Sequence, residues 1–232
     1  MEPIDLASAE ANRIRQAFET RDRGRRPRAS KMRAGARLAT ERSERMRRLV
    51  RALLADIAVP EILDVGCGGG GDLRAWRDAG WPAEKLAGLD LVEDRVIQAR
   101  ALCPGMDIRH SVGPLLPFAD RQFDVATAAT VFSSILDPSV RRDLFADMER
   151  VVRPNGLIVL YDFVVRNPRN GSVEPMGLSR LASIAGRAPD HSERLSPLIY
   201  AVAAGAAVHP WLEGLAMRVA PRTHRISVWR VR

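Results

Sequence analysis

The pattern of apolar and polar residues divides the chain into a short N-terminal part with helical spacing and a longer part that mixes strands and helices. In residues 4–18 and 38–57, apolar positions recur every three or four residues, which places them on one face of a helix. The intervening stretch, residues 21–28, is strongly charged and too polar to pack. We therefore predict that residues 1–57 form an N-terminal helical cap.

The remainder, residues 58–232, contains short apolar runs separated by segments of helical character. Each run is bounded by glycine, proline or polar residues and has the length of a buried strand. The runs cover residues 62–65, 85–90, 106–110, 123–128 and 157–161, and an alternating segment at 226–231 reads as a last strand. This alternation of strand and helix predicts an α/β fold with a doubly wound, mostly parallel sheet.

The first strand ends in a glycine-dense turn, Gly66 to Gly71, followed by a helix. Glycine reaches positive φ and has no Cβ, so such a turn brings backbone close to a nucleotide-like ligand. Roughly twenty residues later the second strand ends in Asp90, a spacing that suits a carboxylate bound to both ribose hydroxyls. Asp64 precedes the turn, where it would repel a pyrophosphate and attract a cation. The pattern implies an adenosine that carries positive charge.

The segment Asp64-Val65-Gly66-Cys67-Gly68-Gly69-Gly70 resembles the first motif of class I S-adenosylmethionine (SAM) methyltransferases, and the similarity to the small-molecule, type 11-like group extends over residues 62–163. The resemblance implies a Rossmann-like sheet of seven strands, the last antiparallel, with SAM as cofactor. Carried over by position, the cofactor-binding residues are Asp64, Gly66, Cys67, Gly68, Asp90, Leu91, Val112, Gly113, Ala129 and Thr130. Val112 departs from the family, where an acid usually binds the adenine amino group.

The acceptor is expected at the carboxyl ends of the strands. The candidate substrate-binding residues there are Phe132, Ser133, Tyr161, Arg166 and Asn167. A hydroxyl acceptor needs a base or a metal to remove its proton. Asp162 is the candidate base, and its alternative role is to anchor the following loop. Motifs within 130–138, 161–170 and 222–224 together resemble methyltransferases of polysaccharide and glycosylated natural-product pathways, which implies a hydroxyl on a sugar or related small metabolite.

The charge of the chain bears on whether the acceptor is a small molecule or RNA. The net charge of +8 is concentrated between Arg21 and Arg51 and raises the possibility of an RNA acceptor. No aromatic residue is interleaved with this basic run to stack bases, and the tetrad typical of base-nitrogen methylation is absent after the fourth strand. We therefore expect a small-molecule acceptor rather than nucleic acid. Loss of catalysis in a SAM-binding protein is the other alternative, since Val112 is unusual and no base is obvious.

The two cysteines and the apolar runs bear on the cell compartment. Cys67 and Cys103 are too few for a disulfide framework and have no neighbours at metal-ligand spacing. No apolar run has the length needed to span a bilayer. We expect a cytoplasmic protein with no bound metal and no membrane span.

Overall fold

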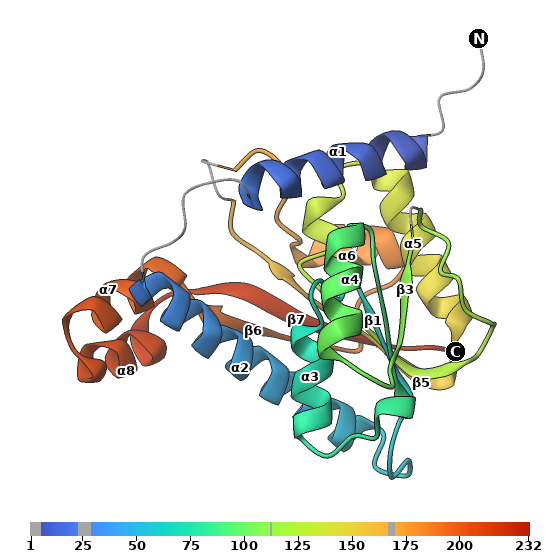
Figure 1. The fold of residues 1–232 in the computed structure, drawn as a ribbon, viewed down its shortest axis with the longest axis horizontal. Coiled ribbons are helices and arrows are strands. Elements are labelled where there is room, and N and C mark those ends of the chain that lie inside the picture. Colours follow the sequence, from blue (N-terminus) through green and yellow to red (C-terminus); the bar gives the residue numbers. More distant parts are fainter. Residues whose placement is uncertain (1–5, 23–28, 112, 167–169) are drawn as a thin grey trace.

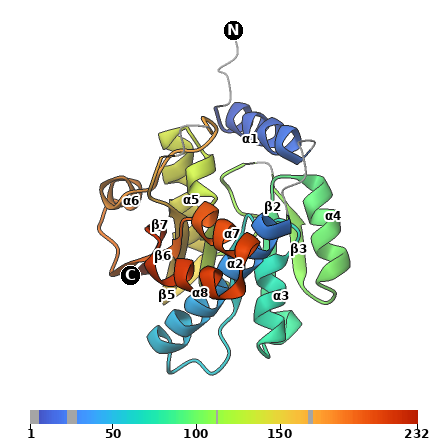
Figure 2. The same cartoon turned by 90° about the vertical axis from the view of Figure 1, so that its left-hand side faces the viewer.

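The structure is a computed structural model that describes residues 6–22, 29–111, 113–166 and 170–232 (Figure 1). Two of the predicted site residues, Val112 and Asn167, lie outside these described residues. The chain forms a central sheet with helices on both faces, and helix α1 lies across one end of the molecule, as Figures 1 and 2 show.

The sheet has seven strands in the order β3-β2-β1-β4-β5-β7-β6. The strands are β1 (Ile62–Val65), β2 (Leu86–Asp90), β3 (Asp107–His110), β4 (Phe123–Ala129), β5 (Val152–Phe163), β6 (His191–Pro197) and β7 (Arg222–Arg230). Strands β1 to β5 are parallel, β7 is antiparallel to β5, and β6 is antiparallel to β7. The predicted Rossmann-like fold is therefore confirmed, and the last strand in the chain, β7, is the one that runs opposite to the other six.

Helices cover the two faces of the sheet. They are α1 (Leu6–Asp22), α2 (Ala29–Leu53), α3 (Gly71–Asp78), α4 (Glu93–Leu102), α5 (Pro138–Val151), α6 (Leu178–Ala185), α7 (Ile199–Val208) and α8 (Pro210–Val219), with 3-10 turns η1 (Ala83–Lys85) and η2 (Phe132–Ser134). Because side chains alternate along a strand, Leu63 and Val65 pack with α5 and α6, whereas Ile62 packs with α2, α3 and α4. Each face of the sheet thus has its own apolar core.

The two N-terminal helices occupy different places. Met46, Leu49 and Val50 of α2 pack in the core that α3 and α4 share, so α2 is one of the helices that cover the sheet. Helix α1 lies instead over the carboxyl ends of the parallel strands (Figure 1). The capping position predicted for residues 1–57 is therefore held by α1, and the division of the chain at residue 57 stays a prediction.

The C-terminal third of the chain supplies the antiparallel strands and the paired helices α7 and α8. These two helices pack on each other and on α2, at one side of the molecule in Figure 1. Among the described residues, no helix combines the length and the apolar character needed to cross a membrane.

Candidate functional site

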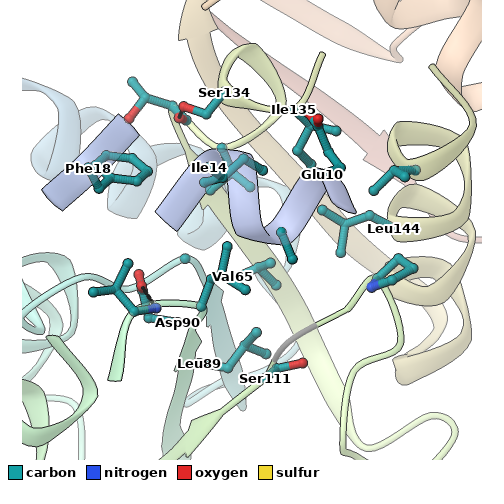
Figure 3. A pocket seen from close by; sticks show the side chains of 18 of the residues that line it. Glu10, Ile14, Phe18, Val65, Leu89, Asp90, Ser111, Ser134, Ile135 and Leu144 are labelled. Atoms are coloured by element: carbon teal, nitrogen blue, oxygen red, sulfur yellow. Dashed lines mark hydrogen bonds between the residues drawn. The ribbon is translucent and has the colours of Figure 1, made fainter. Parts of the chain in front are cut away.

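A cavity of about 280 Å³ lies between α1 and the carboxyl ends of the parallel strands. Glu10, Ile14 and Phe18 of α1 form its roof, and Val65 and Asp90 belong to its floor (Figure 3). The floor is where β1 and β4, the strands at which the connections reverse direction, end side by side. In open α/β sheets this is the position where ligands bind.

Asp90 links the floor of the cavity to the glycine turn. Its Oδ2 accepts a hydrogen bond from the Gly68 N–H at 2.8 Å, and its Oδ1 accepts one from the Val92 N–H at 2.9 Å. The Gly66 N–H donates to the Leu89 carbonyl at 2.8 Å, so the end of β2 fixes the position of the turn. A carboxylate oxygen has two lone pairs, and Asp90 therefore keeps acceptor capacity toward the cavity.

The turn requires glycine for two separate reasons. Gly66 has φ +73° and Gly68 has φ +54°, values at which a Cβ is strained. A Cβ on Gly66 would also stand 2.5 Å from Cγ2 of Val131, whereas nothing lies within 4 Å of one on Gly68. The turn therefore packs closely against the residue that follows β4 at Gly66, whereas the space beside Gly68 is empty of protein atoms.

Six of the ten predicted cofactor residues line the cavity: Gly66, Asp90, Leu91, Gly113, Ala129 and Thr130. Thr130 has φ +59°, a conformation that is uncommon for residues other than glycine and often found at functional sites. Its N–H donates to the Tyr161 carbonyl at 2.7 Å, which holds this strained residue in place at the end of β4.

Asp64 and Cys67, in contrast, are buried behind the turn and do not line the cavity. Asp64 accepts a hydrogen bond from the Thr127 hydroxyl at 2.9 Å. Burial, aided by the negative charge of Asp72, raises the pKa of Asp64 to about 8. Burial also raises the pKa of the Cys67 thiol, which disfavours the reactive thiolate. Both residues support the turn from below in this structure.

None of the described candidates for acceptor binding lines the cavity. Phe132 and Ser133 sit in η2 and are completely buried in the core, because the turn after β4 directs them inward. The Tyr161 hydroxyl donates to Ser196 Oγ at 2.8 Å on the opposite face of the sheet. Arg166 is exposed to solvent. Their predicted role in acceptor binding has no support in this geometry.

Asp162 holds η2 in place. Its Oδ2 accepts a hydrogen bond from the Ser133 N–H and its Oδ1 one from the Phe163 N–H, both at 2.9 Å. Burial raises the pKa of Asp162 to about 6, although the bonds to Ser133 oppose the rise. The side chain is 3% exposed and does not line the cavity. The geometry favours an anchoring role, at η2 instead of the expected loop, over the predicted role as base.

The sequence analysis did not identify the residues of α1 and α5 that complete the cavity. They are Glu10, Ala11, Ile14 and Phe18 of α1, and Val140 and Leu144 of α5, together with Ser134 at the end of η2 and Ile135 after it. The helical spacing of α1 was a usable signal for an apolar face. Where that face docks depends on tertiary contacts that no motif encodes.

Glu10 fastens the roof to the body of the domain. Its carboxylate pairs with Arg13 at 2.8 Å and accepts a hydrogen bond from the Leu136 N–H, while Arg13 donates to the Ser134 carbonyl. Burial alone would raise the pKa of Glu10, but the hydrogen bonds from Arg13 and Leu136 outweigh it, so the pKa is lowered. Glu10 is therefore ionised, and both of its oxygens accept hydrogen bonds that hold α1.

At the other end of α1, the Phe18 ring lies under Arg95 of α4, with the guanidinium carbon 4.2 Å from the ring centroid. Such a cation–π contact is stabilising. Helix α1 is thus attached on both sides of the cavity, to the η2–α5 segment through Glu10 and Arg13 and to α4 through Phe18.

Comparison with known proteins finds a family match over the part of the chain that builds the floor of this site. Residues 62–156 match the family described as methyltransferase domain. The chain is 36% identical over 109 residues to 24-methylenesterol C-methyltransferase 2 of Oryza sativa subsp. japonica (44% of this chain, 29% of that protein). It is 31% identical over 144 residues to tRNA U34 carboxymethyltransferase of Methylococcus capsulatus (59% of this chain, 42% of that protein). The matches span less than half the length of these curated relatives.

Solved structures extend the likeness to most of the chain. A geranyl diphosphate methyltransferase in complex with SAM superposes with a TM-score of 0.62 at 16% identity, covering 87% of this chain and 90% of that one. At this identity the likeness concerns the fold. Residues 62–156 are thus similar to the methyltransferase domain family, the chain has the fold of a SAM-bound methyltransferase, and both support S-adenosylmethionine as the cofactor. The predicted fold and cofactor are confirmed.

Proposed function

We propose that this chain transfers the methyl group of SAM to a small-molecule acceptor, at an oxygen atom. The observation that carries the proposal is that Asp90, the glycine turn and α1 all border one cavity. A roofed cavity of about 280 Å³ suits small ligands and excludes bulk water from the reacting atoms. The activity, the acceptor and the atom methylated are all part of this proposal.

The residues at the floor fit the cofactor. Asp90 would accept hydrogen bonds from the ribose hydroxyls, and the backbone of Gly66 would border the amino acid portion. Leu89, Leu91 and Val92 provide apolar surface beside Asp90, as a purine ring requires. When bound there, SAM supplies an electrophilic methyl group on a sulfonium, which is a good leaving group. The protein then has to position the acceptor and keep the site dry.

Removal of the acceptor proton constrains the kind of hydroxyl. The ionisable side chains among the described lining residues are Glu10, Asp90 and Arg95. Glu10 is held by Arg13 and Leu136, and Asp90 is assigned to the ribose. None of the three is poised as a general base. This supports an acceptor hydroxyl that ionises readily, and the hydroxyl of a sugar, implied by the motif resemblance, would need a base from elsewhere.

Titration calorimetry with SAM and with its demethylated product, S-adenosylhomocysteine, tests the cofactor site. We expect Asp90→Ala to weaken both by about tenfold to a hundredfold, since it removes a charged acceptor of hydrogen bonds. The matched control is Asp78→Ala, because Asp78 is exposed on α3, pairs with the neighbouring Arg77 and does not line the cavity. No heat from the native chain with either compound would contradict the proposal.

Incubation with radiolabelled SAM and a metabolite extract, followed by identification of the labelled compound, tests the transfer itself. A labelled product that requires Asp90 would establish catalysis. Tight SAM binding with no labelled product from any extract would favour the alternative of a SAM-binding protein without catalysis.

RNA methylation is a second candidate function. It is favoured by the net charge of +8 and by the match to a tRNA-modifying relative. Neutralisation of RNA phosphates by basic side chains makes binding fall steeply with salt. Retention of total tRNA on filters that declines steeply with salt would support this candidate, and no retention at low salt would remove it.

A further inference from the structure

The cavity has two chemically different ends. Next to Asp90 and Ser111 it offers polar groups along the ends of β2 and β3 (Figure 3). The other end extends over β4 and β5 toward α5, and we call it the α5 end. It is lined by the apolar side chains of Ala11, Ile14, Val131, Ile135, Val140, Leu144, Phe163 and Val173. Since the ribose-binding acid stands at the first end, the α5 end is left for the acceptor.

The polar groups around the α5 end are already hydrogen-bonded within the protein. The Glu10 carboxylate is bound by Arg13 and by the Leu136 N–H. The Ser134 hydroxyl donates to the Thr130 carbonyl at 3.0 Å. The Asn170 Oδ1 accepts a hydrogen bond from the Ser172 N–H at 3.1 Å. Within the described part of the chain, the Asn170 amide nitrogen has no hydrogen-bond partner at this end. A sugar ring buried here, with several hydroxyls, would replace only part of its lost hydration through the lone pairs and the amide group that these residues keep.

Ile14 occupies the centre of the roof. It lies one helical turn from both Glu10 and Phe18, the two attachment points of α1, and its side chain packs against the core that contains Leu144 and Ile135. Figure 3 shows Ile14 on α1, above Val65, and its side chain lines the cavity. Helix α1 is thus attached to the domain at both ends, and its middle presents an aliphatic surface to a ligand in the cavity.

We propose that the α5 end binds the apolar body of the acceptor, so that the substrate class is a hydrophobic small molecule, with an aromatic or alicyclic ring system and an ionisable hydroxyl such as a phenol. The inference rests on the proposed function, because it assigns the acceptor of that same cavity. It follows from two independent observations: the lining is apolar, and a base is missing among the described residues that line it. A phenolic hydroxyl satisfies both, because its ring fills the apolar wall and its proton leaves near neutral pH more readily than that of an alcohol.

The binding of 2-naphthol, followed by its fluorescence in the presence of saturating S-adenosylhomocysteine, tests this assignment. We expect Ile14→Asn to weaken 2-naphthol binding by about tenfold, since it places a polar amide in the apolar wall. The matched control is Ile97→Asn, because Ile97 is 58% exposed on α4 and does not line the cavity. The control should stay within about twofold of the native chain.

Methyl β-glucoside serves as the polar probe in a competition measurement. We expect it not to displace 2-naphthol. Displacement by the glucoside at concentrations similar to those of naphthol, or equal effects of the two asparagine variants, would overturn the assignment. Binding of S-adenosylhomocysteine without any binding of 2-naphthol would also overturn it, whereas failure to bind S-adenosylhomocysteine would count against the proposed function instead. If Ile14→Asn does not fold, Ile14→Ala replaces it, with an expected loss of about threefold or more.

Discussion

At the scale of the residue, the site depends on a few backbone positions. Gly66 combines a positive φ with close approach to Val131, and Thr130 keeps a strained conformation opposite it. The sequence placed Gly66 and Asp90 at this site, and both line the cavity, because they belong to one local strand–turn–helix unit and to the strand beside it. It misplaced Phe132 and Ser133, because the direction of side chains in a 3-10 turn is set by packing and not by the order of residues.

Substitution of Gly66 tests the two reasons for glycine at this position, the positive φ and the close approach to Val131. We expect Gly66→Ala to lower the free energy of unfolding by about 2–4 kcal/mol, from backbone strain plus the contact with Val131. Gly80→Ala is the control, because Gly80 has φ +93° with nothing within 4 Å of its position for a Cβ, and it should cost about 1–2 kcal/mol. Urea denaturation measures both. Equal losses of unfolding free energy in the two variants would show that Val131 moves away from the new Cβ without destabilising the fold.

His224 on β7 provides a test of how the stability of the protein depends on pH. It stacks on Tyr161, with ring centroids 4.9 Å apart and an interplanar angle of 7°. Burial, with a smaller contribution from Arg42, lowers the pKa of His224 from 6.5 to about 4. Because the folded state disfavours the charged form, the contribution of neutral His224 to stability is complete above pH 6.5 and is lost as the pH falls toward 4.

We therefore expect the difference in unfolding free energy between the native chain and His224→Phe to shift by about 2–3 kcal/mol in favour of the variant from about pH 7 to about pH 4.5. Subtracting the two curves cancels the titration of Asp162, which the variant keeps. Parallel curves over this interval would show that His224 titrates normally.

At the scale of the element, the sequence analysis predicted a helical cap but not the contacts that dock α1. Apolar spacing predicted a helix at residues 4–18, and the structure has one at Leu6–Asp22. Its docking depends on Glu10 and Arg13 reaching backbone groups of the η2–α5 segment, contacts between residues more than a hundred positions apart. Strand β6 was missed for a related reason, since its polar sequence becomes a strand only by pairing with β7.

Loosening the roof should be visible in exchange kinetics. We expect Glu10→Ala to speed dissociation of S-adenosylhomocysteine by about tenfold and to increase hydrogen exchange along α1, because the half-buried Leu136 N–H and Arg13 lose their acceptor. Gln16→Ala is the control, because Gln16 is exposed on the same helix. Unchanged dissociation in Glu10→Ala would mean that α1 does not control access to the cavity.

At the scale of the whole molecule, the fold was predictable to the extent that it is buried. The parallel strands β1, β2 and β4 lie between two layers of helices, so most of their residues are apolar and form visible runs. The floor of the site follows from this arrangement, because the carboxyl ends of those strands meet at one edge. The roof and the acceptor end combine segments from both halves of the chain, and only the packed molecule brings them together.

Because α1 is itself a wall of the cavity, any ligand that touches it adds binding free energy to the contacts that keep the helix docked. A ligand bound in the cavity should then slow proteolytic cleavage within the first 22 residues, although these residues lie away from the reacting atoms. The N-terminal helix would act as a built-in reporter, more protected from a protease the better a compound fills the space beneath it.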